Sequence, residues 1–143
     1  MFQSTGKLLY DPHKNGKRFI KPSDWWMILK TDEGIVEYYK YWIQRQFDVK
    51  FEMTIWGSHI SVNRGFKPPN QEFWNKYAGE QIEFTYTNRI YRANDLFFCV
   101  DAYSSRLEAI RLELGLSKQP NFGFHLTIGR INKEYALKRA SAI

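Results

Sequence analysis

The chain of 143 residues has a single cysteine, Cys99, and no apolar run approaching the length of a membrane span. One cysteine can form no disulfide within the chain and cannot supply a cysteine-based metal cluster. The first residues are polar and basic, without the apolar segment of a secretion signal. From these absences we expect a cytoplasmic, soluble protein with no membrane contact, no metal and no cofactor.

Acidic residues are in the minority, 15 against 21 lysines and arginines, which leaves a formal net charge of +6. A basic surface attracts anionic partners such as nucleotides and nucleic acids. The basic residues are scattered, with no run of five or six, and this favours a small phosphorylated substrate over a long duplex. We expect a nucleotide or oligonucleotide as the partner, and nothing in the sequence indicates an obligate protein partner.

Two segments, residues 58–65 and 124–130, follow one pattern. Each reads histidine, aliphatic residue, hydroxyl residue, aliphatic residue, with an arginine five places after the histidine. A strand alternates its side chains between two faces, so each histidine and the hydroxyl residue two places on point the same way. If the fold brings the two strands together, four polar side chains converge: His59, Ser61, His125 and Thr127.

The predicted elements before each histidine come in the same order. An apolar strand at 25–29 is followed by an amphipathic helix from about 33 to 47, with Thr31 or Asp32 as its N-cap, and then by the His59 strand. An apolar strand at 96–100 precedes a helix capped by Ser104 or Ser105, and then the His125 strand.

This repetition predicts an α+β fold of duplicated, two-lobed strand-helix-strand units, with central antiparallel strands around a cleft. One domain would span residues 24–143, with lobes at about 24–90 and 91–143. Residues 1–23 hold glycines and prolines among basic residues, which predicts an irregular N-terminal arm or short hairpin.

Four further segments are assigned from periodicity and turn residues alone. Residues 49–55 and 82–87 alternate as strands, 72–77 fit a short helix, and 88–95 form a hairpin-like link. The tail from residue 132 is expected to be a short basic helix or frayed.

His59-Ile60-Ser61 and His125-Leu126-Thr127 resemble the signature of the 2H phosphoesterase superfamily, two His-x-Thr/Ser motifs with one in each lobe of a duplicated α/β fold. The resemblance covers about residues 24–131, and Ser61 stands where threonine is commonest. In size the chain is similar to small phage-type members, among them anti-CBASS nucleases, which cleave cyclic oligonucleotide immune signals, and RNA-repair-like proteins. A phage-encoded member would act in the host cytoplasm.

The resemblance implies a metal-independent phosphodiesterase acting on cyclic nucleotides or cyclic oligonucleotides. One imidazole would serve as base and the other as acid, and the hydroxyls of Ser61 and Thr127 would donate hydrogen bonds to the phosphoryl oxygens. Which histidine is the acid stays open. The alternatives are a phosphodiesterase for RNA ends with 2′,3′-cyclic phosphates or for 2′,5′ linkages, and a non-catalytic RNA-binding module.

Five further residues are candidates for binding substrate. Asn63 lies on the histidine face by strand alternation, whereas Arg64 and Arg130 reach the site only where their strands have ended or bulged. Tyr10 could stack on a base if the arm folds back, and Trp56 is the other aromatic residue near a motif. No carboxylate or thiol stands at metal-ligand spacing from the histidines.

Overall fold

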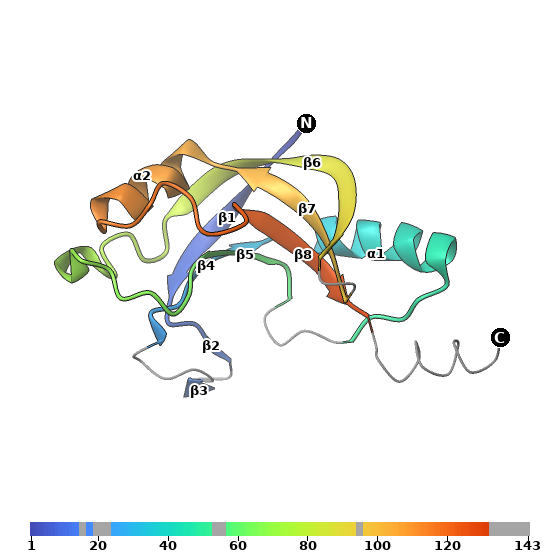
Figure 1. The fold of residues 1–143 in the computed structure, drawn as a ribbon, viewed down its shortest axis with the longest axis horizontal. Coiled ribbons are helices and arrows are strands. Elements are labelled where there is room, and N and C mark those ends of the chain that lie inside the picture. Colours follow the sequence, from blue (N-terminus) through green and yellow to red (C-terminus); the bar gives the residue numbers. More distant parts are fainter. Residues whose placement is uncertain (15–16, 19–23, 53–56, 94–95, 132–143) are drawn as a thin grey trace.

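The computed structural model describes residues 1–14, 17–18, 24–52, 57–93 and 96–131 (Figure 1). The first half of this part of the chain forms β1 (Phe2–Tyr10), β2 (His13–Lys14), β3 (Lys17–Arg18), β4 (Met27–Thr31), α1 (Glu33–Phe47) and β5 (His59–Asn63). The second half forms the 3-10 helix η2 (Gln71–Phe73), β6 (Gln81–Ala93), β7 (Phe97–Tyr103), α2 (Ser105–Glu113) and β8 (His125–Arg130).

Six strands close into an antiparallel barrel in the order β1-β4-β5-β8-β7-β6, and β2 pairs with β3 separately. The β1–β6 ladder runs from Phe2 opposite Tyr86 to Lys7 opposite Gln81. On the other side of the ring β5 pairs with β8, with Ile60 opposite Leu126. The α+β class predicted from the sequence is confirmed, and the strands form one closed ring.

Both helices begin where the sequence predicts. The Asp32 carboxylate accepts a hydrogen bond from the Gly34 N–H at 2.7 Å, and the Ser104 hydroxyl accepts one from the Leu107 N–H at 3.2 Å. Such caps satisfy N–H groups that have no partner within the helix. Figure 1 shows α1 and α2 at opposite ends of the barrel. Neither of these helices, within the part of the chain described, is long and apolar enough to cross a bilayer.

One apolar core joins the helices to the barrel. Its members from β5, β8 and the helices are Ile60, Val62, Leu126, Ile128, Val36, Tyr39, Ile43, Leu107, Ile110 and Leu114. The residues between them on β5 and β8 point to the opposite face of the sheet. The core therefore covers one face of these two strands, and the face that carries His59 and His125 does not contribute to it.

The N-terminal segment differs from the predicted irregular arm, because Phe2–Tyr10 form a barrel strand. Gly6 signals a turn when read alone, but here it allows two strands to approach closely. A Cβ atom at Gly6 would lie 2.7 Å from both Leu29 Cγ and the Lys30 carbonyl oxygen. The domain therefore begins before residue 24.

Three other segments also differ from expectation. The strand predicted at 82–87 continues through the expected link as β6, and a register shift between Tyr86 and Ile90 absorbs the irregularity. Instead of a helix at 72–77, a 3-10 turn spans Gln71–Phe73. In the strand predicted at 49–55, Phe51 forms an isolated β-bridge with Ile131, and residues 53–56 lie outside the described part of the chain. The predicted tail from residue 132 also lies outside it.

Candidate active site

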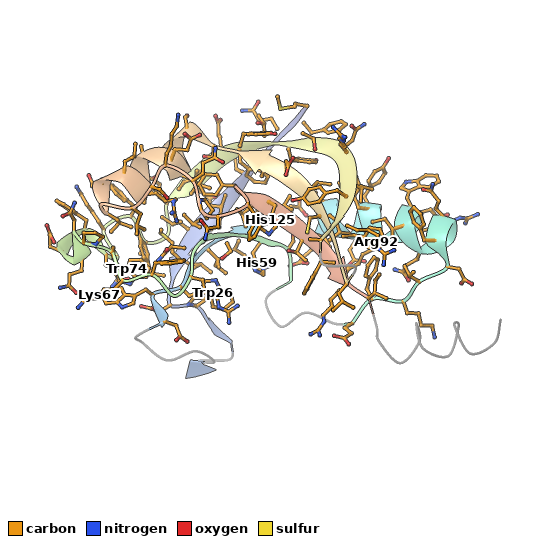
Figure 2. The ribbon with its side chains drawn as sticks, viewed as in Figure 1. Trp26, His59, Lys67, Trp74, Arg92 and His125 are labelled. Atoms are coloured by element: carbon orange, nitrogen blue, oxygen red, sulfur yellow. The ribbon has the colours of Figure 1, made fainter. Side chains whose placement is uncertain are left out.

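The two histidine motifs lie side by side because β5 and β8 are neighbours in the barrel. With Ile60 opposite Leu126, one residue to either side places His59 opposite Thr127 and Ser61 opposite His125. All four side chains share the sheet face that the core leaves free. Figure 2 shows His59 and His125 close to the middle of the molecule.

Each histidine is held by the carbonyl group two residues before it. Nδ1 of His59 lies 3.0 Å from the Gly57 oxygen, and Nδ1 of His125 lies 3.1 Å from the Gly123 oxygen. A carbonyl oxygen only accepts, so Nδ1 carries the proton in both rings. The Nε2 atom of each neutral ring therefore keeps a lone pair free to accept a proton.

The two turns before the histidines have the same backbone geometry. Gly57 and Gly123 have φ values of 64° and 69°, in the left-handed region that favours glycine. The residue between each glycine and its histidine accepts a backbone hydrogen bond of 3.0 Å, Ser58 from Thr31 and Phe124 from Ala102. This Gly-x-His pattern was not predicted, although both copies are visible in the printed sequence.

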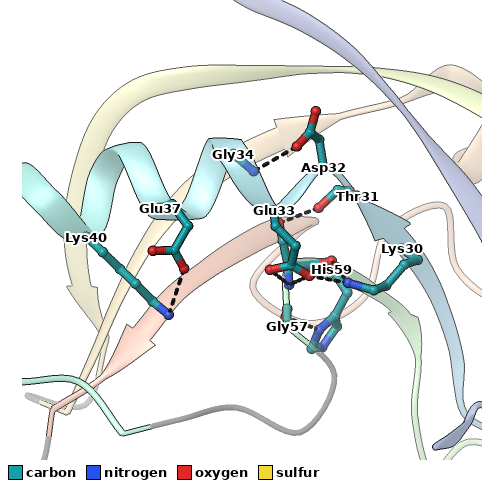
Figure 3. A network of polar contacts seen from close by, with 10 residues as sticks. Lys30, Thr31, Asp32, Glu33, Gly34, Glu37, Lys40, Gly57 and His59 are labelled. Carbon is teal, nitrogen blue, oxygen red and sulfur yellow. Dashed lines mark hydrogen bonds and ion pairs between the residues drawn. The ribbon is translucent and has the colours of Figure 1, made fainter.

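Glu33, in the first turn of α1, anchors the turn that precedes His59 (Figure 3). Its carboxylate oxygens accept the Ser58 N–H at 3.0 and 3.1 Å and form an ion pair with Lys30. Burial acts to raise the pKa of Glu33, but the hydrogen bonds from Lys30 and Ser58 outweigh it and leave the pKa below its usual value. Glu33 is therefore ionised at neutral pH and positions the His59 turn.

His59 is half-buried, and its surroundings favour the neutral imidazole. Burial is the largest cause that lowers its pKa, and the positive charges of Lys30 and Arg64 lower it further, whereas the hydrogen bond to the Gly57 carbonyl and the negative charge of Glu33 act to raise it. The residues opposite the two histidines carry opposite charges, since Lys30 pairs with His59 and Asp101 pairs with His125 in the strand registers. The two imidazoles thus differ in electrostatic environment.

Trp26 lies behind the first motif and contacts three of its residues. It is 4% exposed, and its indole Nε1 donates a hydrogen bond to the Ser61 hydroxyl oxygen at 3.2 Å. The ring lies edge-on to His59, with 6.0 Å between centroids, and the Arg64 guanidinium carbon lies 4.5 Å above it. Sequence patterning assigned Trp26 to an apolar strand and missed its part in the site.

Two cavities lie on either side of His125, which lines both. The first cavity has a volume of about 310 Å³ and is lined by Ser61, Asn63, Arg64 and Arg111 among others. The second cavity has about 750 Å³ and lies against Thr127, with aromatic walls from Tyr91, Phe97 and Phe122. These volumes fall within or near the range of roughly 300–1,000 Å³ of small-molecule sites.

The remaining predicted residues divide between the site and other places. Asn63 and Arg64 line the first cavity, and β5 ends at Asn63, so Arg64 lies just past the strand. Arg130 instead forms an ion pair with Glu52 at 3.8 Å and lines neither cavity. Trp56 lies outside the described residues.

Tyr10 has a packing position and does not lie over the histidines. Its ring meets Trp74 edge-to-face with 4.9 Å between centroids, and it lines neither cavity beside His125. Burial raises the pKa of its phenol to about 12. Tyr10 is the last residue of the barrel strand β1 and does not belong to an irregular arm, so its side chain packs beneath the segment around η2.

Within the described ranges, no group of three or more histidine, cysteine, aspartate or glutamate side chains could hold a metal ion. Comparisons of the chain with protein-family models, with curated proteins and with solved structures gave no significant match. The interpretation of the site therefore rests on its own geometry and on the motif resemblance.

Proposed function

We propose that the protein is a metal-independent phosphodiesterase of the 2H type that cleaves cyclic nucleotides or cyclic oligonucleotides by paired-histidine acid-base catalysis. The observation that carries this proposal is the matched pair of imidazoles on adjacent strands. Each has Nδ1 bound to a glycine carbonyl, Nε2 free, and a hydroxyl residue two places on. His125 lines both cavities and His59 lines neither, but the two lie on one face of adjacent strands. Two oriented, titrating groups on one sheet face meet the requirement of acid-base catalysis.

In this mechanism His59 is the base and His125 the acid. His59 Nε2 takes a proton from water as the water oxygen bonds to phosphorus, and protonated His125 gives its proton to the departing ester oxygen as the P–O bond breaks. The lowered pKa of His59 supports its role as the neutral partner. The hydroxyls of Ser61 and Thr127 donate hydrogen bonds to the phosphoryl oxygens, where negative charge builds up.

The same proposal includes a duplicated, two-lobed fold. The elements β4, α1 and β5 follow one another as β7, α2 and β8 do, and each set is preceded by a strand that pairs with its first member, β1 or β6. The matched hydrogen bonds at the two histidine turns support an origin by duplication. Residue similarity between the halves is confined to the motifs.

A small cyclic substrate fits the surroundings better than a long RNA. Both spaces beside His125 are partly open cavities of small-molecule size, and the second cavity is lined by three aromatic side chains on which a base can stack. The overall positive charge also favours nucleotides in general. With the resemblance to phage-type members, this points to cyclic oligonucleotide signals and a counter-defence role in the host cytoplasm, with RNA-end processing as the alternative substrate for the same chemistry.

The test is hydrolysis in EDTA of adenosine 2′,3′-cyclic monophosphate, cyclic di-AMP, cyclic triadenylate and 2′,5′-linked diadenylate. We expect turnover by the wild type and by His13→Ala, and a loss of about 10²- to 10⁴-fold in His59→Ala and His125→Ala, since general acid and base each contribute roughly 10²–10⁴. Turnover that survives either substitution would overturn the catalytic assignment. No turnover combined with tight RNA binding would support the binding-module alternative.

A further inference from the structure

Arg111 is a buried cation in α2, at the wall of the first cavity. Only 4% of its surface is exposed. Its Nε donates to the Ser117 carbonyl at 2.7 Å, one Nη to the Val62 carbonyl at 2.6 Å and the other Nη to the Ser117 hydroxyl at 3.2 Å. These contacts use three of the five N–H donors of a guanidinium and leave one on each terminal nitrogen.

No carboxylate in the described part of the chain compensates this charge. None of the described aspartates and glutamates forms an ion pair with Arg111, in contrast to Arg106 on the same helix, which pairs with Glu80 at 2.8 Å. Removing an ion from water costs several kcal/mol in real proteins unless an opposite charge offsets it. Burial accordingly lowers the pKa of Arg111. Carbonyl and hydroxyl partners orient the guanidinium without neutralising it.

The first cavity has the polarity of an anion site. Two arginines, Arg64 and Arg111, line it, and no aspartate or glutamate does. Asn63, which also lines the cavity, is 2% exposed and donates from Nδ2 to two backbone carbonyls at 2.9 Å, so it holds the wall in place. A ligand that complements this cavity therefore carries an anionic group.

We propose that the first cavity binds the nucleotide next to the scissile bond, with Arg111 holding a second, non-reacting phosphate. The two free N–H groups of Arg111 form the fork that binds a phosphate through two oxygens. The inference rests on the proposed function and sharpens it, because the substrate must then have at least two phosphates, as cyclic dinucleotides and larger rings do. A mononucleotide would leave the cavity empty.

The kinetic test compares Arg111→Gln with Arg106→Gln, which removes the same charge from the same helix away from the cavity. On cyclic di-AMP we expect kcat/KM to fall about 10- to 100-fold in Arg111→Gln, the loss of a hydrogen-bonded charged contact, and to stay within about twofold in Arg106→Gln. On adenosine 2′,3′-cyclic monophosphate both variants should match the wild type. Equal losses on both substrates, or no loss on cyclic di-AMP, would overturn the proposal. Linear 5′-phosphorylated diadenylate shows whether the ring or the second phosphate is recognised.

A binding test does not depend on turnover, so it separates this proposal from the proposed function. In protein carrying His59→Ala and His125→Ala, we expect sodium phosphate to raise the melting temperature above that in sodium chloride of equal ionic strength, since a ligand of the folded state stabilises it. Arg111→Gln should abolish the rise and Arg106→Gln should keep it. A rise that survives Arg111→Gln rules out Arg111 as the phosphate ligand.

Ser117→Asp tests the same proposal without removing Arg111, in case Arg111→Gln fails to fold. Ser117 is exposed and already accepts from Arg111, so an aspartate there supplies an internal carboxylate to the guanidinium. We expect this variant to melt at or above the wild-type temperature in chloride, to lose the rise in phosphate, and to lose activity on cyclic di-AMP alone. If phosphate still stabilises it as it does the wild type, the cavity is not the anion site.

Discussion

The indole of Trp26 donates a hydrogen bond to the hydroxyl oxygen of Ser61 over 3.2 Å. An oxygen that accepts from behind keeps its own proton available in front, and in Ser61 that front is the first cavity beside His125. In the proposed mechanism, Trp26 therefore acts through Ser61 as a positioning residue and does not itself contact substrate.

Trp26→Phe should lower kcat/KM by about 3- to 10-fold, because a neutral hydrogen bond contributes roughly 0.5–1.5 kcal/mol. The phenyl ring retains most of the packing against His59 and Arg64. The measurement is kcat/KM in Trp26→Phe, in Ser61→Ala and in the double variant. The two single effects should not add, because both act through one hydroxyl. Full additivity would mean that Trp26 acts by another route.

Gly57→Ala and Gly123→Ala should both lower the free energy of unfolding, by about 1–2 kcal/mol for the left-handed backbone alone. Gly57→Ala should be the more harmful, since its Cβ would lie 2.1 Å from Glu33 Oε1, whereas at Gly123 the nearest atom is Gln119 Oε1 at 3.1 Å. Urea unfolding measures the stabilities and initial rates measure the activities. Equal effects of the two substitutions would contradict the role assigned to Glu33.

Lys30→Met should move the acidic limb of the pH profile of kcat/KM to higher pH. Lys30 is a positive neighbour that lowers the pKa of His59, so its removal raises that pKa. The base is then protonated, and inactive, at pH values where the wild-type base is still free. Lys118→Met, at a lysine that pairs with Glu108 and is not among the charges acting on His59, is the control and should leave the limb in place. A limb that moves to lower pH in Lys30→Met would remove His59 from the role of base.

Phe122→Ala should raise KM by about fivefold or more with almost no change in melting temperature. Phe122 is 94% exposed and has a φ of 71°, which side chains rarely adopt, yet it stands at the wall of the second cavity. Stacking of a base on an aromatic ring contributes roughly 1–3 kcal/mol. Leu112→Ala, at an exposed apolar residue of α2, is the control. An unchanged KM in Phe122→Ala would show that no base stacks there.

The parts of the fold that follow local rules could be predicted from the sequence. Period-two alternation places His59 and Ser61 on one face of a strand, and hydroxyl or carboxylate caps begin both helices, as Asp32 and Ser104 do. The repeated order of elements also indicated that the two motif strands belong together. The direct pairing of β5 with β8 joins segments that are far apart in the sequence. Only the repeated order of strand, helix and strand indicated it.

Other features depend on neighbours that are distant in sequence. Gly6 has the appearance of a turn residue until the side chain of Leu29 is placed against it. Arg111 stands four residues after Leu107 and three before Leu114, so its place on the buried face of α2 could have been noticed, but not that it would lack a counterion. The glycine carbonyls that orient the histidines are backbone groups, and only the spacing Gly-x-His hints at them.

The barrel is held together unequally on its two sides. Ile60 and Leu126 form the one registered pair of the β5–β8 ladder within the described residues, whereas the β1–β6 ladder on the far side pairs six residues of each strand. The barrel is thus closed firmly by the β1–β6 ladder and only narrowly by the β5–β8 pairing, where the histidines lie. We therefore expect the positions of the histidines to depend on the strands behind them, so that a substitution in the β1–β6 ladder changes the spacing of the two imidazoles without contacting either one.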